Sequence, residues 1–354
     1  MIWSKAYRHT TADSVAALSL CEANVLEAGQ RESIFYKFGR LLLREDFFSS
    51  APDAGLYERS SAVVRLMTGK SPVYWQAMRL FAGRVPICSA ATAILLKNNI
   101  RAVYPQHGLT LKVSNPHDGA STDRIVNEAT NRKVIKDAGG FIVPRIIQSR
   151  KVAKAAYILE NLLENHRPFA ASDVDSSFVS GFVKFQIANQ TKEFAQTDKF
   201  NPVLEIGKFE ALASVTNLNI SPRLRSFLKT AVEKTALSAP ISLCHGDLSR
   251  SNILVSNKQF AIIDWEFSRA APAASDAVRL ATQFPGFAEA YINELRHPDA
   301  RAGFVLGCVH AANAHAERLH GLAVNRHQHM ATRKTARKIA EIITLADRLA
   351  VRET

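Results

Sequence analysis

The hydrophobic pattern divides the chain into three regions. In residues 1–80, apolar positions recur at helical spacing, first over residues 14–28 and again over residues 34–43. Residues 81–160 contain the short, alternating runs expected of strands, and residues 161–354 carry longer helical patterns. The pattern therefore predicts a helical N-terminal extension, then a small β-rich lobe, then a mainly helical lobe.

One short stretch of the helical region is patterned as a β-hairpin. Residues 253–255 and 260–263 are apolar and rich in β-branched side chains, and the residues between them are turn formers. Asp247 and Asn252 precede the first strand, and Asp264 follows the second. Because paired strands bring the two ends of a hairpin together, we expect these three side chains to converge.

These residue types suit metal-assisted phosphoryl transfer. Mg²⁺ prefers oxygen ligands and is typically held by one or two carboxylates together with substrate phosphates, which makes Asn252 and Asp264 candidate ligands. A hydroxyl that attacks a γ-phosphoryl group needs an acceptor for its proton, and Asp247 fits that role. Taken singly, Asp247 could equally cap a helix and Asp264 could simply end a strand. The arrangement as a whole favours phosphoryl transfer.

Residues 245–266 resemble the catalytic core of the aminoglycoside phosphotransferase and choline kinase superfamily, small-molecule relatives of the protein kinases. The loop reads His-Gly-Asp-Leu-Ser-Arg-Ser-Asn, and Ile-Ile-Asp-Trp-Glu replaces the Asp-Phe-Gly of protein kinases. The resemblance implies an α+β, two-lobed protein-kinase-like fold with a small β-rich N-lobe and a mainly helical C-lobe. It also implies that Asp247 is the catalytic base and that Asn252 and Asp264 bind Mg²⁺.

A second element of the family follows the hairpin. Pro272 and Asp276 are similar to its Pro-x-x-Asp sequence, with one additional residue between them. We interpret Asp276 as structural rather than catalytic. The resemblance extends over residues 100–285 and hardly reaches the flanks.

A kinase-like core also needs an upstream lysine on a strand, a helical glutamate to hold it, and a hinge. Residues 108–113 alternate apolar and polar positions, which places Lys112 on a strand. A helix is predicted over residues 123–138, and Glu128 on it is the expected partner of Lys112. The alternative is that both are ordinary surface charges. The backbone expected to contact the adenine of ATP, or the base of GTP, is that of Glu160, Asn161 and Leu162.

The phosphate loop departs from the kinase pattern. Kinases cover the phosphates with a glycine-rich hairpin, yet between residues 81 and 112 the chain has only Gly83 and Gly108. The small side chains of residues 88–93 could approach phosphates instead. The missing glycines favour one alternative function, a pseudokinase-type binding or regulatory scaffold.

Composition sets outer limits on the class of protein. The chain has 354 residues, of which 47% are hydrophobic, and no apolar run approaches the length of about 20 residues that spans a bilayer. Its start lacks the apolar block of a secretory signal, so we expect a cytoplasmic protein. The four cysteines are far apart, which favours neither a zinc site nor disulfides. We interpret Cys244 as a buried strand cysteine rather than a nucleophile.

The net charge of +13 implies attraction to anions. Its densest block, residues 326–338, is followed by apolar positions at near-helical spacing, which predicts a basic amphipathic helix. This helix could simply pack on the large lobe, or it could contact an anionic substrate or, peripherally, a membrane surface. Nucleic acid is not expected, because no basic-aromatic interleaving is present.

The sequence after Asp264 indicates the class of acceptor. Protein kinases place a long activation segment there, closed by Ala-Pro-Glu, and this chain has neither. We therefore predict an ATP- or GTP-dependent phosphotransferase acting on a hydroxyl of a small molecule or glycan, such as a sugar, amino alcohol or antibiotic. The positive charge favours an anionic acceptor. An atypical protein kinase remains an alternative.

Overall fold

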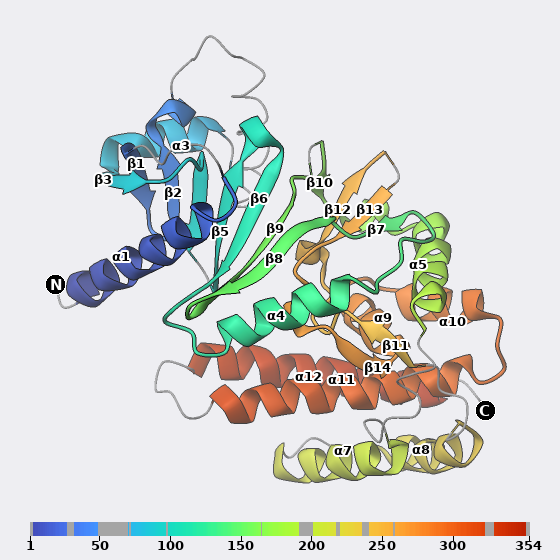
Figure 1. The fold of residues 1–354 in the computed structure, drawn as a ribbon. Helices are drawn as coiled ribbons and strands as arrows, with labels where there is room; N and C mark the ends of the chain where they lie inside the picture. Colours follow the sequence, from blue (N-terminus) through green and yellow to red (C-terminus); the bar gives the residue numbers. More distant parts are fainter. Residues whose placement is uncertain are drawn as a thin grey trace. The chain divides into compact units, whose positions relative to one another are not determined.

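The computed structural model describes most of the chain (Figure 1). The chain forms two compact units. Unit 1 comprises Met1–Val134, Val143–Pro168 and Leu254–Asn257, and unit 2 comprises Ile135–Ile142, Phe169–Ile253 and Lys258–Thr354. The predicted α+β class is confirmed, whereas the three-region division remains a prediction. The described residues are 3–26, 32–48, 70, 72–96, 98–163, 165–190, 201–216, 220–235, 241–257, 259–322 and 329–351.

Unit 1 is built on an eight-stranded sheet with the order β3-β1-β2-β4-β5-β6-β9-β8. Each neighbouring pair is antiparallel. The strand predicted around Lys112 is confirmed as β6. The strands are β1 (Glu32–Phe38), β2 (Leu41–Arg44), β3 (Gly83–Cys88), β4 (Ala93–Leu96), β5 (Asn99–Tyr104), β6 (Leu109–Ser114), β8 (Ile146–Val152) and β9 (Ala155–Asn161).

The helix predicted over residues 34–43 is wrong, because this segment forms the β1–β2 hairpin. Aromatic and β-branched side chains dominate β1, and such residues fit a pleated, half-buried surface. Gly39 supplies the turn with a φ of 60°. Phe35 and Leu42, which are fully buried in the sheet core, show that tertiary packing decided the structure here.

The N-terminal helix α1 (Trp3–Glu22) confirms helix over the first part of the predicted extension. Leu18 and Cys21 pack into the core of the sheet. At the end of α1, Glu22 is buried and accepts hydrogen bonds from Ser89 Oγ at 2.6 Å and Tyr104 Oη at 2.5 Å. Burial raises the pKa of Glu22 above its ordinary value, and these two hydrogen bonds oppose that shift. The helix is thereby joined to the β3–β4 connection.

The second predicted helix of this part is shorter than expected. Helix α4 spans Ser121–Arg132 rather than continuing to residue 138. Beyond it, the backbone N–H and C=O groups of Lys136 both bond to the side chain of Asn189, at 2.8 and 2.9 Å. These peptide groups are used in a tertiary contact and are not available to a helix.

Unit 2 is mainly helical around short strands. Strand β7 (Phe141–Ile142) pairs in parallel with β13 (Gln259–Ile262), and β11 (Ile241–Cys244) pairs antiparallel with β14 (Arg269–Pro272). The strands of the predicted hairpin are present as β12 (Ile253–Ser256) and β13, and β10 (Arg167–Pro168) pairs antiparallel with β12. The principal helices are α5 (Ser176–Ala188), α7 (Pro202–Thr216), α8 (Pro222–Thr235), α9 (Ala274–Ala281), α10 (Phe287–Leu295), α11 (Ala300–Leu322) and α12 (His329–Val351).

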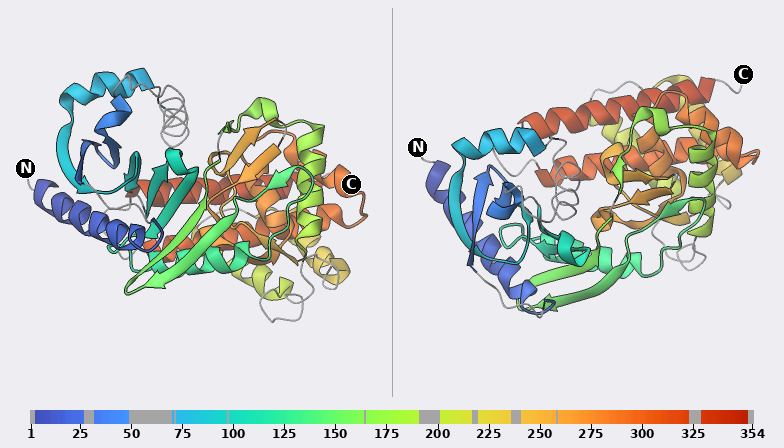
Figure 2. Two further views of the ribbon diagram at one scale, coloured as in Figure 1. Left: turned by 45° about the horizontal axis from the view of Figure 1, so that its top comes forward. Right: turned by 90° about the horizontal axis from the view of Figure 1, so that it is seen from above.

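The basic C-terminal segment forms α12, which runs beside α11, as the turned views also show (Figure 2). Among the described side chains of α12, Ile339, Ile342, Ile343, Leu345 and Leu349 are buried. Arg337 is exposed and pairs with Glu341 at 2.8 Å. A helix that binds a membrane surface needs its apolar face exposed, so the burial of that face agrees with the packed-helix interpretation. The side chains of residues 326–334 lie outside the description.

Across the helices that the structure describes, none has the length and apolar character required to span a bilayer.

Glu205 joins α7 to α11 and gives a stability prediction. Burial alone would raise its pKa, but hydrogen bonds from His310 and Asn313 lower it to about 2. A depressed carboxylate pKa contributes stability that is present above the ordinary value of 4.5 and is lost as pH falls toward 2. Glu205→Gln should therefore lower the free energy of unfolding at pH 7 by about 2 kcal/mol, a difference that shrinks in acid.

Chemical denaturation at several pH values measures this difference. Glu317→Gln, an exposed carboxylate on α11, is the matched control and should change stability little. An equal loss in both variants at pH 7 would contradict the role assigned to Glu205.

Candidate active site

The loop that leaves β11 is held by one buried carboxylate. Asp276 on α9, which is 5% exposed, accepts the N–H of His245 at 2.6 Å and the N–H of Gly246 at 3.1 Å. Both carboxylate oxygens are used, so the first two peptide groups of the loop have fixed positions. Asp276 therefore has the structural role expected from the sequence.

Gly246 is required by the geometry of this loop. Its φ is 77°, in the left-handed region that favours glycine. A Cβ atom built at this position would lie 2.1 Å from the carbonyl oxygen of Phe267. The loop thus packs directly against the backbone that follows Asp264.

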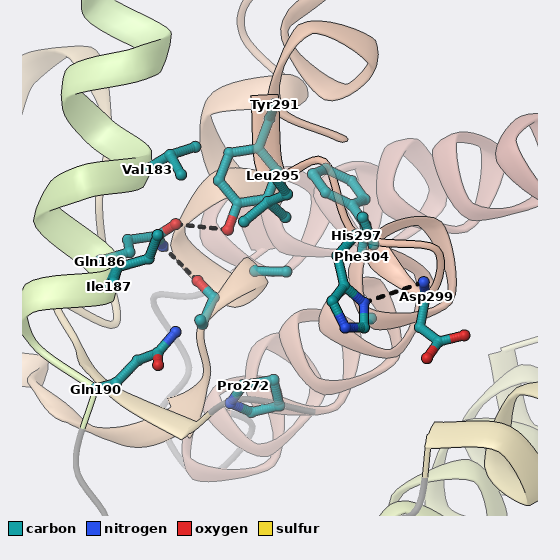
Figure 3. Close-up of a pocket in the computed structure, with 14 residues that line it drawn as sticks. Val183, Gln186, Ile187, Gln190, Pro272, Tyr291, Leu295, His297, Asp299 and Phe304 are labelled. Carbon is teal, nitrogen blue, oxygen red and sulfur yellow. Dashed lines mark hydrogen bonds between the residues drawn. The ribbon is translucent and has the colours of Figure 1, made fainter. Parts of the chain in front are cut away.

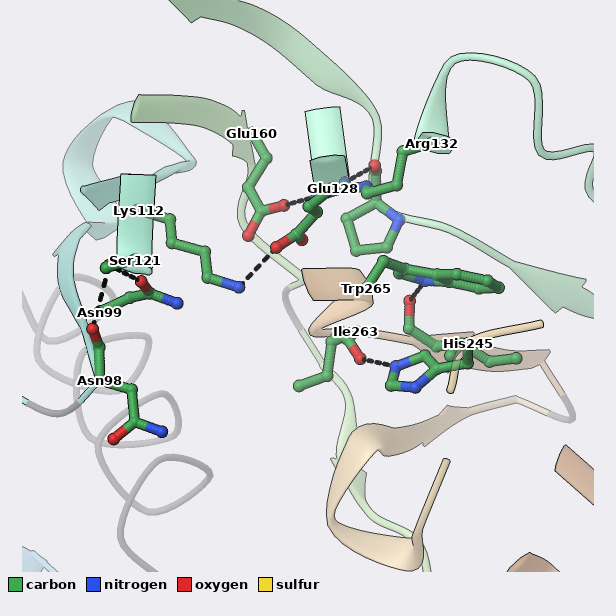
Figure 4. A network of polar contacts seen from close by, with 12 residues as sticks. Asn98, Asn99, Lys112, Ser121, Glu128, Arg132, Glu160, His245, Ile263 and Trp265 are labelled. Carbon is green, nitrogen blue, oxygen red and sulfur yellow. Dashed lines mark hydrogen bonds and ion pairs between the residues drawn. The ribbon is translucent and has the colours of Figure 1, made fainter. Parts of the chain in front are cut away.

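His245 links the loop to the end of the hairpin. The backbone N–H of Asp247 donates to His245 Nδ1 at 3.2 Å, so Nδ1 carries no proton. The proton is therefore on Nε2, which donates to the carbonyl oxygen of Ile263 at 2.7 Å (Figure 4). His245 is fully buried, with its ring 4.9 Å from that of Trp265. The side chain is a structural bridge in this arrangement.

The structure brings together the three residues that the hairpin pattern selected. Asn252 Nδ2 donates to the backbone oxygen of Asp247 at 2.9 Å. The N–H of Ile263, which precedes Asp264, donates to the backbone oxygen of Asn252 at 3.0 Å. Asp264 itself adopts left-handed backbone angles, φ 65° and ψ 55°, which are uncommon for a residue with a side chain and occur often at functional sites.

Sequence reasoning missed Arg279, which contacts the predicted base. Arg279 Nη1 lies 3.1 Å from Asp247 Oδ1, and the arginine side chain is only 7% exposed. The signal was its spacing, because residues three apart on a helix share one face and Arg279 is three residues after Asp276.

Cys244, next to His245, is the buried strand cysteine that was expected. Its thiol lies 3.4 Å from the carbonyl oxygen of Pro272. Burial raises the pKa of Cys244 well above its ordinary value, so the thiol stays protonated. Because the thiolate is the nucleophilic form, this cysteine is unsuited to nucleophilic catalysis.

In unit 1, the predicted lysine and glutamate form an ion pair. Lys112 Nζ lies 2.6 Å from Glu128 Oε2, and both side chains are almost completely buried. The contact was expected from the sequence, and it joins β6 to α4. Burying charges is costly unless they are paired, which makes each residue dependent on the other.

The pair extends into a network that sequence reasoning did not include. Arg132 Nη1 lies 3.1 Å from Glu128 Oε1 and 2.6 Å from Glu160 Oε2 (Figure 4). Burial would lower the pKa of Arg132, but attraction to Glu160 and Glu128 raises it above its ordinary value. Two cations and two carboxylates therefore alternate. Arg132 was detectable in principle, since it is four residues after Glu128 on one helix face.

The predicted hinge residues end strand β9. The N–H of Asn161 donates to the Arg145 carbonyl at 3.2 Å, and the N–H of Leu162 donates to the Gly108 carbonyl at 2.8 Å. Glu160 uses its side chain in the charged network. Two N–H groups of the backbone that was expected to contact a nucleotide base are therefore already bonded within unit 1.

The hairpin that precedes the lysine strand is β4–β5, which contains no glycine. Ser121 Oγ, at the start of α4, lies 3.1 Å from the Asn98 carbonyl oxygen and 2.5 Å from Asn99 Oδ1. The hairpin is thus attached to the helix that carries Glu128. Residues 88–93, which could have approached phosphates in place of a glycine loop, span the end of β3, the β3–β4 connection and the start of β4, and Ser89 there bonds Glu22.

Residues 192–304 match the phosphotransferase enzyme family. This segment is thus similar to that family. It contains the loop, the hairpin and α9, and so the resemblance of residues 245–266 and the prediction of a phosphotransferase are both confirmed at the level of the family.

Several solved structures are similar to this chain. A choline/ethanolamine kinase family protein from Mesorhizobium loti has 14% identity, with 72% of this chain and 90% of that chain covered and a TM-score of 0.41. The GDP complex of aminoglycoside 2'-phosphotransferase-IIIa has 13% identity, coverages of 72% and 90%, and a TM-score of 0.48. A putative aminoglycoside phosphotransferase from Ralstonia eutropha has 11% identity, coverages of 72% and 89%, and a TM-score of 0.48. Among curated proteins, none matches the chain.

A separate cavity of about 370 Å³ lies in unit 2 (Figure 3). Its lining is mostly apolar, and Tyr291 Oη donates to Gln186 Oε1 there at 2.6 Å. It includes none of the residues predicted to be catalytic. The lining residues are Val183, Gln186, Ile187, Gln190, Pro272, Ala273, Ala274, Tyr291, Leu295, His297, Asp299, Ala300, Gly303 and Phe304.

Asp276→Asn tests the anchoring of the loop. An asparagine oxygen can accept one of the two N–H groups of His245 and Gly246, but its NH₂ group would oppose the other. We expect the free energy of unfolding to fall by about 1–3 kcal/mol and phosphotransferase activity to fall with it.

Thermal unfolding and activity are measured together, with Glu294→Gln on α10 as the control for loss of one negative charge in the same unit. If Asp276→Asn kept the stability and activity of the wild type, the carboxylate would not be the anchor.

Proposed function

We propose that the chain is an ATP- or GTP-dependent kinase that transfers the γ-phosphoryl group to a hydroxyl of a small molecule or glycan. The observation that carries the proposal is the hydrogen-bonded network that joins Asp247 and Asn252 to the backbone of Ile263, which directly precedes Asp264. The match to a phosphotransferase family supports it independently.

The residues present fit Mg²⁺. Asn252 uses its Nδ2 atom on the Asp247 carbonyl, which leaves Oδ1 as the atom of its amide suited to a cation. Asp264 adds a carboxylate at the adjoining end of the hairpin. One carboxylate with one amide oxygen, completed by phosphates and water, is a usual magnesium donor set. When bound, Mg²⁺ neutralises charge that develops on the transferring phosphoryl group.

Asp247 has the role of base in this proposal. Its carboxylate accepts the proton of the acceptor hydroxyl and orients the oxygen for attack. A bond forms between this oxygen and the γ-phosphorus, while the bond from that phosphorus to the bridging oxygen breaks. The nucleoside diphosphate leaves with the electron pair of the broken bond.

Lys112 and the end of β9 would bind the nucleotide. The Lys112–Glu128 pair corresponds to the lysine and helix glutamate that kinases use for the phosphates. The N–H groups of Asn161 and Leu162 are bonded within unit 1, so other backbone groups near Glu160 would contact the base. The glycine-free β4–β5 hairpin is the observation that favours the scaffold alternative.

An anionic acceptor suits the charge of the chain. The net charge is +13, and Arg250, which lies in the catalytic loop itself, is exposed. A sugar that already carries phosphate or carboxylate would be attracted by such a surface. A cationic acceptor would be repelled.

Asp247→Ala tests the proposed base. The chain is incubated with Mg²⁺, γ-labelled ATP or GTP, and a panel of hydroxyl compounds with and without anionic groups. We expect transfer by the wild type and a loss of about 100-fold or more in kcat for Asp247→Ala. Glu294→Ala, in the same unit, should retain activity. Transfer at an unchanged rate by Asp247→Ala would remove this residue from the chemistry.

Lys112→Met tests the nucleotide site separately. Losing the cation should raise the KM for nucleotide and weaken thermal stabilisation by nucleotide with Mg²⁺, which for the wild type is about 2.7 kcal/mol at 100 times the dissociation constant. Lys151→Met, an exposed lysine on β8, is the control. If nucleotide stabilises the wild type but no phosphoryl transfer is detected, the scaffold alternative is favoured. If only polypeptides are labelled in a cell extract, a protein kinase is favoured.

A further inference from the structure

Helix α9 and the turn after it contact the catalytic loop at three points. Asp276 binds the N–H groups at the start of the loop. Arg279 contacts the side chain of Asp247. Gln283 accepts the N–H of Arg250 at 3.1 Å, near the end of the loop. Asp276 and Arg279 stand at positions i and i+3 of α9, which lie on one helical face, and Gln283 stands in the turn that follows.

The backbone carbonyl of Arg279 is held by hydrogen bonds from the turn after α9. Its carbonyl oxygen accepts hydrogen bonds from Thr282 Oγ1 at 2.9 Å and from Gln283 Nε2 at 2.7 Å. Its side chain is 7% exposed, whereas that of Asp247 is 37% exposed. The guanidinium is therefore the more buried partner, and the carboxylate is the group with more freedom to turn in solvent.

We infer that Arg279 is a positioning residue for the base, an inference that rests on the proposed function of Asp247. A planar guanidinium that bonds Oδ1 fixes the plane of the carboxylate, because charge-assisted hydrogen bonds are directional. Fixing this plane sets the direction in which the carboxylate meets the acceptor hydroxyl. Small errors in such alignment cost large factors in rate.

The contact acts on the side chain of the base rather than on the loop backbone. Asp276 and Gln283 already hold the peptide groups on either side. Removing the guanidinium therefore leaves the loop in place while Asp247 loses its orientation. The expected signature is a lower kcat with little change in the KM for nucleotide.

Arg279→Met and Arg279→Lys in the full chain test this inference. The methionine variant should lose about 10- to 100-fold in kcat. Its KM for nucleotide should stay within about 2-fold of the wild-type value, because Arg279 is not expected to contribute to nucleotide binding. Lysine keeps a charge without the planar fork and should recover part of the loss. Arg301→Met, a partly buried arginine of α11 that pairs with Glu289, is the matched control and should keep full kcat.

Two further measurements separate positioning from a structural effect. Guanidinium chloride at low concentration should raise the kcat of Arg279→Met, whereas urea at the same concentration should not, because urea lacks the charge. In the double variant with Asp247→Ala, the loss should equal that of Asp247→Ala alone, since an orienting group has no effect once its target is gone.

The outcomes distinguish this inference from the function it rests on. If the wild type transfers phosphate and Arg279→Met keeps its kcat, the positioning role alone is overturned. The same holds if the kcat losses of Arg279→Met and Asp247→Ala add fully in the double variant. Equal loss in the lysine and methionine variants with no guanidinium rescue also overturns it. A wild type that transfers no phosphate overturns the proposed function, and the positioning role falls with it.

Discussion

The carboxylate of Asp276 receives two consecutive peptide N–H groups, those of His245 and Gly246. The rest of the loop depends on this contact, because it holds Gly246 against the carbonyl oxygen of Phe267, where there is no room for a Cβ atom. His245 then reaches the Ile263 carbonyl and carries the constraint across to the end of the hairpin. A single buried charge thus determines where the polar residues of the loop and hairpin meet, and its own burial is offset by the N–H groups it accepts.

Unit 1 uses charge in a different way. Four ionised side chains alternate in sign from Lys112 through Glu128 and Arg132 to Glu160, and no net charge is buried. Losing any one member would leave an unbalanced charge in a desolvated site, which costs more than an absent surface pair. The network therefore links the position of α4 to two strands of the sheet. This arrangement restricts how far the lysine strand and the helix can move apart.

The sequence predicted the parts of the molecule that depend on local spacing. The hairpin, the strand of Lys112 and its pairing with Glu128 follow from alternation, turn residues and motif order. Contacts between distant segments were not predictable in this way. Arg279 and Arg132 acquire partners only when a helix packs on a loop or a strand, and a single sequence contains that information only as helical spacing.

The error over residues 34–43 has the same physical origin. An apolar run of this length satisfies helical and extended periodicity almost equally, and burial against neighbouring strands decided between them. The end of α4 was misplaced for a similar reason, since Asn189 captures the peptide groups of Lys136 from far along the chain. Local pattern fixed the type of most elements, and tertiary hydrogen bonds fixed their ends.

The spacing of Asp276, Arg279 and Gln283 restricts how this region can evolve. Each residue of an α-helix turns the chain by about 100°, so a single inserted or deleted residue between Asp276 and Arg279 would point the guanidinium away from the loop. Exchanges of side chains on the other faces of α9 leave the spacing intact. Descendants of this gene should therefore vary here in composition and never in length.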